Sequence, residues 1–236
     1  MPPETSNQED VSAIAFGLSA LAIALAVVAY FFNSSIGVTL FRLIEIVAAA
    51  LPWAVVWMQA RWPLLINVGG DKKDPRPGMT FVFMGSGICL IATQFQNLQI
   101  DEFSALLVYA CAPAAVMSCA LCLASPRDQQ SMSKYLSIFV LVAFYGFGLV
   151  RQTNTALDRS PARQYSAQVV SKDTRHGSRG STSYHLWLDG EGLPATVQQV
   201  SVDLHLYDSE AIGSTVCVTA RDGALHVPWY TIHSCQ

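Results

Sequence analysis

The strongest constraint on this chain is a series of long apolar segments that fills the sequence up to Val150 and then stops. A helix needs about 20 mostly apolar residues to cross the hydrocarbon core of a bilayer. Five segments approach or exceed that length, and four of them carry no charged residue. A re-entrant course stays open for the third segment, which contains two glycines and two glutamines. The predicted transmembrane helices cover residues 11–32, 36–58, 79–96, 105–124 and 135–150.

The composition changes at the end of the fifth segment. Over the whole chain 52% of the residues are hydrophobic and 13% are charged, against roughly 25% charged residues in soluble domains. All five histidines follow residue 150. We therefore expect an N-terminal segment, a transmembrane domain, a linker and a soluble domain. These parts cover residues 1–10, 11–150, 151–164 and 165–236.

From Tyr165 onward the hydrophobic pattern has a period of two, which is typical of β-strands. The stretch STSYHLWLD places Leu186 and Leu188 on one face and Trp187 and Asp189 on the other, solvent-facing side. Further strands are predicted in VQQVSVDLHL and STVCVTA, and RDGALHVPWYTI holds an Asp-Gly hairpin signal between two apolar runs. The predicted fold is a membrane α-helical bundle of about five helices followed by a small all-β domain, a barrel or sandwich.

The basic residues of the short loops predict which side of the membrane each part occupies, because cytoplasmic loops carry an excess of Lys and Arg. The connections after the second and fourth segments hold six such residues, and the other two short connections hold none. With five spans, the N-terminus is then cytoplasmic and the β domain periplasmic, in a bacterial inner membrane. The six residues are Arg61, Lys72, Lys73, Arg76, Arg127 and Lys134.

Cysteine usage is a second indication of location. Cys217 and Cys235 are the only cysteines after residue 150, and the other four lie in apolar segments. An even number of cysteines in an exported domain favours a disulfide. We therefore predict a bridge between Cys217 and Cys235 and a periplasmic domain.

One charge pair lies within the apolar part. Arg42 and Glu45 are three residues apart in the second segment, on one face of a helix. Charged residues in transmembrane helices are candidates for ion or proton pathways, and Gln94 and Gln96 could extend such a path. The alternative is a structural ion pair near the membrane surface, which the position of Arg42 favours.

Four histidines of the β domain are ligand types that zinc or copper uses. They lie on separate predicted strands, without the spacing of a preformed site, and oxidised cysteines could not join them as thiolate ligands. The prediction is no metal and no cofactor, with a metal-binding or sensing domain as an alternative function. The residues are His185, His205, His226 and His233.

The last 80 or so residues resemble the tails of a broad group of uncharacterised proteobacterial inner-membrane proteins. The likeness rests on a Tyr, a Gly-x-x-Val strand, a Gly-Ala-Leu turn and a Trp-Tyr pair. The resemblance implies several helices followed by a small periplasmic β domain, and no activity. In architecture alone the chain is similar to NfeD-type membrane proteins. The residues are Tyr207, Gly213, Val216, Gly223, Ala224, Leu225, Trp229 and Tyr230.

The sequence contains no nucleophile, metalloprotease, phosphate-loop or dinucleotide motif. Its net charge of −3 gives no indication of nucleic-acid binding. We therefore predict a non-enzymatic, multi-pass membrane protein. Its β domain serves protein interaction or envelope maintenance, with another envelope protein or a second copy as partner. A transport or channel subunit is the first alternative, and the sequence does not identify a small-molecule substrate.

Overall fold

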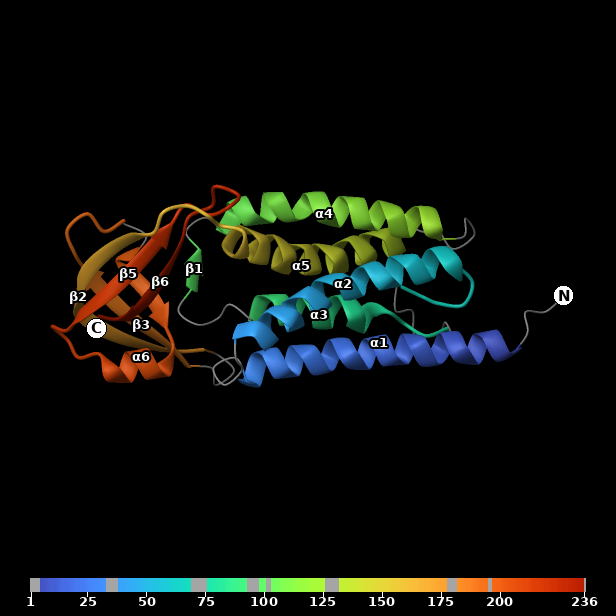
Figure 1. The fold of residues 1–236 in the computed structure, drawn as a ribbon, viewed down its shortest axis with the longest axis horizontal. Coiled ribbons are helices and arrows are strands. Elements are labelled where there is room, and N and C mark those ends of the chain that lie inside the picture. Colours follow the sequence, from blue (N-terminus) through green and yellow to red (C-terminus); the bar gives the residue numbers. More distant parts are fainter. Residues whose placement is uncertain are drawn as a thin grey trace. The chain divides into compact units, whose positions relative to one another are not determined.

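The structure, a computed structural model, describes residues 5–32, 38–68, 76–92, 98–100, 103–125, 132–177, 182–194 and 197–235. The chain divides into two compact units. The helical unit comprises Met1–Thr93 and Leu106–Gln152, and the β unit comprises Gln94–Ala105 and Thr153–Gln236. The predicted fold class, a helical part followed by a C-terminal β domain, is confirmed (Figure 1).

The helical unit contains long helices that lie side by side (Figure 1). Among the described residues, four helices are long and apolar enough to cross a bilayer, as in a multi-pass membrane protein. The remaining apolar helix has 13 residues, or about 20 Å at 1.5 Å per residue. The helices are α1 (Thr5–Phe32), α2 (Val38–Arg61), α3 (Thr80–Ala92), α4 (Phe103–Ala124) and α5 (Met132–Ala156).

Several helix ends differ from the prediction, since α1 begins at Thr5, α2 ends at Arg61 and α5 begins at Met132. α5 continues past Val150 to Ala156, because the polar residues Gln152 and Asn154 are buried there instead of facing solvent. α3 is described to Ala92, and residues 93–96 of the predicted third segment lie outside the described residues.

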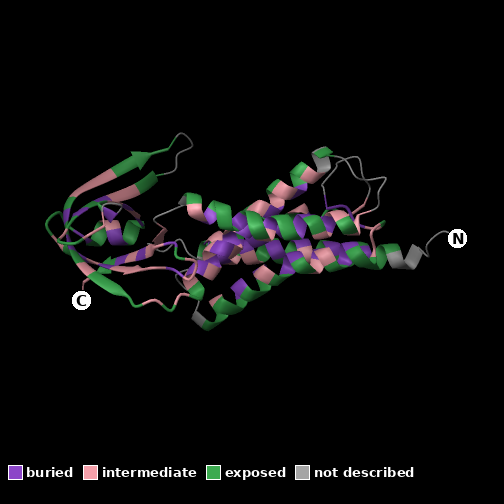
Figure 2. Ribbon diagram, turned by 90° about the horizontal axis from the view of Figure 1, so that it is seen from above, coloured by how far each residue is buried: buried purple, intermediate pink, exposed green. Residues whose placement is uncertain are grey.

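Small residues let the helices of this unit approach closely. Ala15, Ala22 and Ala29, spaced seven apart on α1, are almost fully buried. A Cβ placed on Gly85 of α3 would lie 2.7 Å from the backbone oxygen of Ala22. Such contacts replace the hydrophobic effect as the packing force inside lipid. Figure 2 shows the buried residues on the sides of these helices that face one another and the exposed residues on the outside.

Parts of the described chain between α2 and α3 are buried without being helical. Ile66, Val68 and Met79 are at most 3% exposed. The backbone N–H of Asn67 donates to Pro77 O at 3.1 Å, and that of Met79 donates to Asn67 O at 3.0 Å. Irregular backbone inside a membrane protein is tolerated where such bonds and protein packing replace water.

The β unit is one six-stranded antiparallel sheet in the order β1-β6-β5-β2-β3-β4. The side-chain amide of Gln99 on β1 donates to Ser201 O on β4 at 2.6 Å. This bond links the two outer strands, so the sheet is nearly a barrel. The strands are β1 (Leu98–Ile100), β2 (Arg163–His176), β3 (Thr182–Asp189), β4 (Gln199–Val202), β5 (Thr215–Arg221) and β6 (Trp229–Ser234).

The alternation predicted for STSYHLWLD is confirmed, because Leu186 and Leu188 are buried and Trp187 and Asp189 are exposed. The strand predicted in VQQVSVDLHL is present but covers only Gln199–Val202. β4 ends at Val202, and residues Leu204–Ser209 form the short helix α6. The cause is Asp203, which caps α6 by accepting a hydrogen bond from the N–H of Leu206 at 2.7 Å.

Candidate functional site

The last turn of α5 belongs to the β unit and holds the loop that precedes β6. Asn154 is fully buried. Its side-chain amide donates to Val227 O at 2.9 Å, and its side-chain oxygen accepts from the N–H of Leu225 at 2.9 Å. Its backbone oxygen also accepts from the N–H of Ala224 at 2.9 Å. The region predicted as a linker therefore begins with three hydrogen bonds to a loop some seventy residues later in the sequence.

Asp158, which follows α5, also accepts hydrogen bonds from residues near the start of β6. One carboxylate oxygen accepts from the N–H of Ser160 at 2.7 Å. The other accepts from the backbone N–H of Gly223 at 3.1 Å and from the indole N–H of Trp229 at 2.8 Å. Burial raises the pKa of Asp158, but these donors outweigh that effect and hold the pKa below its usual value. Gly223 has a φ of 79°, which favours glycine at this position.

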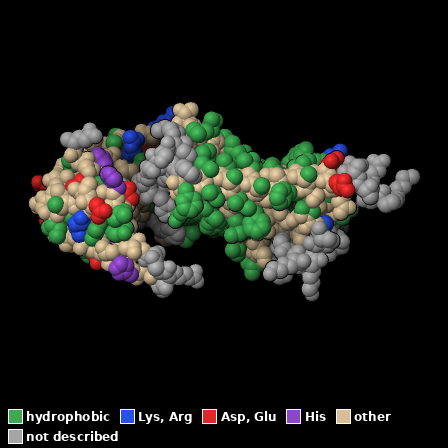
Figure 3. All heavy atoms as spheres, turned by 90° about the horizontal axis from the view of Figure 1, so that it is seen from below, with side chains coloured by type: hydrophobic (Ala, Val, Ile, Leu, Met, Phe, Trp, Pro, Cys, Tyr) green, Lys and Arg blue, Asp and Glu red, His purple; other side chains and the backbone are tan. Residues whose placement is uncertain are grey.

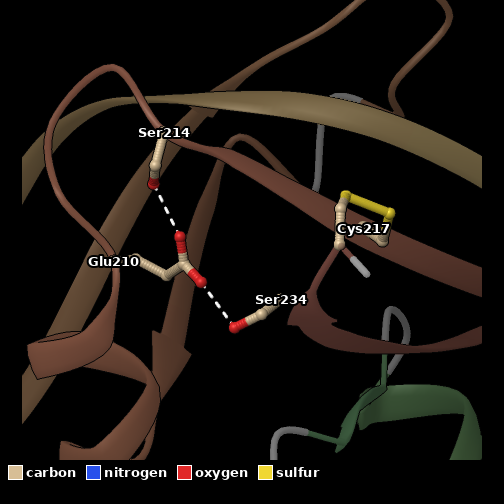
Figure 4. Close-up of a disulfide and its surroundings, with 5 residues drawn as sticks. Glu210, Ser214, Cys217 and Ser234 are labelled. Carbon is tan, nitrogen blue, oxygen red and sulfur yellow. Dashed lines mark hydrogen bonds between the residues drawn. A yellow bond between two sulfur atoms is a disulfide. The ribbon is translucent and has the colours of Figure 1, made fainter.

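A disulfide and a set of side-chain hydrogen bonds hold the end of the sheet that contains the C-terminus. Cys217 of β5 and Cys235, just past β6, form a disulfide with their Cα atoms 5.0 Å apart, as the sequence predicts. Beside it, the buried Glu210 accepts hydrogen bonds from Ser214 Oγ at 2.6 Å and Ser234 Oγ at 2.5 Å (Figure 4). These hydroxyls hold the pKa of Glu210 below its usual value, with a smaller contribution from the charge of Lys172.

Lys172 stabilises the end of α6. Its ammonium group donates to Tyr207 O and, at 2.8 Å, to Glu210 O. It also lies 4.1 Å from the centre of the Tyr207 ring. A cation favours the carbonyl end of a helix. The bonds of Lys172 and Glu210 thus hold the chain between α6 and β5 in place. The role of both residues here is structural.

The outer face of the sheet carries exposed apolar side chains around an irregularity in β2. The register between β2 and β3 shifts at Val170, between the pairs Val169 with Leu188 and Ser171 with Trp187. Val170 is 49% exposed and Trp187 is 38% exposed, while Val169 and Leu188 point into the core. A bulge of this kind redirects side chains toward a surface.

A third exposed apolar residue comes from a neighbouring segment. Ile212 is 66% exposed. It precedes Gly213, whose N–H donates to Val169 O at 2.8 Å. We call Val170, Trp187 and Ile212 the bulge surface. Exposed aromatic and aliphatic groups on a stable sheet are typical anchors of protein interfaces.

The predicted charge pair of α2 is present as an ion pair. Arg42 Nη1 and Glu45 Oε2 are 3.0 Å apart. The Arg42 side chain is 54% exposed and that of Glu45 is 9% exposed, an arrangement in which arginine reaches outward and neutralises a buried carboxylate. Gln94 and Gln96, the other proposed members of a polar path, lie outside the described residues. The transport alternative stays a prediction.

The four candidate histidine ligands come from different parts of the β unit. His185 lies on β3, where its Nε2 is 3.1 Å from Ser183 Oγ, and His205 lies on α6. His226 occupies the loop before β6 with a φ of 58°, and His233 lies on β6. Within the described ranges, no three residues of the types His, Cys, Asp and Glu gather in a metal-binding group.

Sequence reasoning missed Asn154, Asp158 and Glu210, the polar residues that organise the β unit. The bonds of Asp158 to Trp229 and of Glu210 to Ser234 join residues 71 and 24 positions apart. No local spacing marks such pairs. The one sequence signal for Asn154 was its position among polar residues directly after an apolar segment.

Charged residues are gathered at two places on the surface. Figure 3 shows hydrophobic side chains over most of the helical unit, charged side chains on the β unit and at one end of the helices, and histidine side chains on the β unit. Comparison with family models, with characterised proteins and with solved structures finds no match to this chain.

Proposed function

We propose that this protein is a non-enzymatic component of the bacterial inner membrane that presents its β domain in the periplasm to bind another envelope protein. The helices anchor the domain, and the bulge surface is the contact region. The observation that carries the proposal is the exposed Trp187 beside the bulge at Val170. Tryptophan is strongly enriched among the residues that dominate binding energy.

The pairing of β1 supports the membrane sidedness. β1 lies between α3 and α4 in the sequence, and it pairs with β6 near the C-terminus. The α3–α4 connection and the β domain therefore share one side of the membrane. This relationship does not depend on whether α3 crosses, because only α4 and α5 separate β1 from β2.

The charges of the connecting loops then favour a periplasmic domain. Arg127, in the connection between α4 and α5, and Lys134, in the first turn of α5, lie on the opposite side, while NLQIDEFS, which leads from α3 into α4, has no basic residue. The positive-inside rule assigns the former connection to the cytoplasm. The disulfide between Cys217 and Cys235 agrees, because such bonds persist in oxidising compartments.

Site-directed photocrosslinking in cells tests the contact region. A photoreactive phenylalanine analogue replaces Trp187 in one variant and the exposed Gln164, also on the sheet, in a matched control. We expect a discrete crosslinked product from position 187 and none from position 164. A product of twice the chain's mass identifies a second copy as the partner. Equal labelling at both positions, or none at either, contradicts the proposal.

A further inference from the structure

The disulfide of the β unit lies on the outer face of the sheet. Val216 and Val218, on either side of Cys217 in β5, are fully buried. The alternation of side chains along a strand therefore turns Cys217 outward. Cys217 and Cys235 are both half-buried, so an attacking thiolate can reach the bridge. Exposed disulfides are more easily reduced than buried structural ones.

The bridge fastens the end of β6 to the sheet. In the part of the chain that the structure describes, the last pair between β5 and β6 is Val216 with Ser234. Cys235 follows directly beyond that pair, and the disulfide joins it to Cys217. The ends of strands open more readily than their middles. Reduction of the bridge therefore allows Ser234 to separate from β5.

Ser234 also joins β6 to the segment that follows α6. Its Oγ donates to Glu210 Oε1 at 2.5 Å, and Ser214 Oγ donates to Glu210 Oε2 at 2.6 Å (Figure 4). Glu210 is only 7% exposed. A buried carboxylate that loses one of its donors pays a desolvation penalty without compensation. The loss of Ser234 therefore favours a movement that brings Glu210 to water.

The segment from Glu210 to Ser214 carries one residue of the bulge surface. Ile212 lies in the middle of this segment and is 66% exposed. Further bonds join the segment to β2, among them the bond from the N–H of Gly213 to Val169 O at 2.8 Å. Such bonds remain when the contact with β6 is lost, so the segment can shift while the sheet stays intact. A change at Glu210 thus reaches Ile212 within two residues.

We propose that the disulfide between Cys217 and Cys235 is a redox switch of the bulge surface. In the oxidised protein the bridge holds Ser234 against Glu210 and thereby fixes Ile212 in its position beside the bulge. In the reduced protein the segment 210–214 loosens, and the surface loses its defined shape. This inference names a regulation of the contact region and rests on the proposed function.

The reductant is a dithiol, either a small molecule or a protein of the same compartment. One of its thiolates attacks a sulfur of the bridge, which breaks the bond between Cys217 and Cys235 and forms a mixed disulfide. Its second thiolate then displaces the attacked cysteine and closes the reductant's own disulfide. Two electrons pass to the protein, and both cysteines end as thiols after taking up the two protons that the dithiol releases.

Hydrogen exchange of the purified, intact chain in detergent, with and without dithiothreitol, tests the switch. Reduction should speed exchange in the segment 210–214 at least about tenfold, the change that about 1.4 kcal/mol of lost stabilisation produces. Exchange over β3 should stay the same, because its partners in the sheet are β2 and β4. This comparison needs no variant.

The variant S234A separates the switch from the general effect of a disulfide. It keeps the bridge and removes the donor to Glu210, so its oxidised form should already exchange rapidly over 210–214. Reduction should then add little, because the two changes act through one contact. H233A is the matched control, since His233 is an exposed neighbour on β6, directly opposite Cys217. It should respond to reduction as the wild type does.

Three results would overturn the inference. The first is unchanged exchange over 210–214 in the reduced wild type, and the second is equal acceleration over β3, which indicates a general loss of stability. The third is a response to reduction in S234A as large as that of the wild type. Exchange is measured without a partner, so its failure is distinguishable from a failure of the crosslinking at Trp187.

Discussion

Asn154, in the last turn of α5, and Val227, in the loop before β6, are joined by a hydrogen bond of 2.9 Å from the side-chain amide to the backbone oxygen. The same side chain accepts from the N–H of Leu225. One buried residue thus satisfies both a donor and an acceptor of a loop that would otherwise be left unpaired. The end of the helix is part of the folding of the β domain.

Replacing Asn154 with Ala should loosen this loop. Both bonds are lost and the buried groups have no replacement, which costs roughly 2–4 kcal/mol. Hydrogen exchange measured by mass spectrometry should show faster exchange over residues 222–228. N154D keeps the acceptor for Leu225 but places a buried carboxylate oxygen against Val227 O, so its loop should exchange at least as fast as that of N154A. Exchange in N154A equal to that of the wild type would show that the loop is held by other contacts.

Glu210 should make the stability of the β domain sensitive to acid. Its pKa in the folded protein lies below the usual 4.5, so it binds a proton less readily folded than unfolded. Its stabilisation is therefore present above pH 4.5 and is lost as the pH falls through the folded pKa. Melting temperatures measured from pH 7 to pH 3 should fall less steeply for E210Q than for the wild type. The exposed Glu191 provides the control E191Q, which should follow the wild type.

The double variant C217S/C235S should unfold at lower temperature than the wild type. The bridge closes a loop of sequence separation 18, for which restriction of the unfolded chain predicts roughly 3 kcal/mol. Adding a reductant to the wild type should reproduce the variant's melting temperature and leave the variant itself unchanged. If reductant destabilises both proteins equally, the disulfide is not the cause.

Gly85 should be intolerant of even one added methyl group. A Cβ there would lie 2.7 Å from Ala22 O and 2.8 Å from Ala22 C, which are backbone atoms that cannot rotate away. We expect G85A to lower the melting temperature in detergent because α1 and α3 must separate. G17A is the matched control, since nothing lies within 4 Å of a Cβ at Gly17. Similar melting temperatures for the two variants would contradict this packing.

The helices could be predicted from the sequence because their signal is local. An apolar stretch such as the one from Val11 to Phe32 is long enough to span a bilayer wherever it occurs. β1 could not be predicted in this way. Its three residues lie between two apolar segments, and they form a strand only because β6, far along the chain, offers a pairing edge.

The other differences between prediction and structure arise from helix capping and from contacts between residues far apart in the sequence. Asp203 carried a helix-start signal for α6 that the apolar pattern of the surrounding stretch obscured. The candidate site could be predicted in part. Trp187 faces outward because side chains alternate along β3, as the sequence indicates, whereas the bulge at Val170 is a property of strand pairing and not of either segment alone.

Thiol labelling in intact cells tests the location of the β domain most directly. A variant lacking Cys89, Cys111, Cys119 and Cys122 keeps only the pair of the β domain. It is treated with a membrane-impermeant thiol reagent before and after reduction. The account predicts labelling of Cys217 and Cys235 only after reduction, as for a disulfide on the periplasmic side. Labelling that requires the cells to be broken open would place the domain in the cytoplasm and contradict the account.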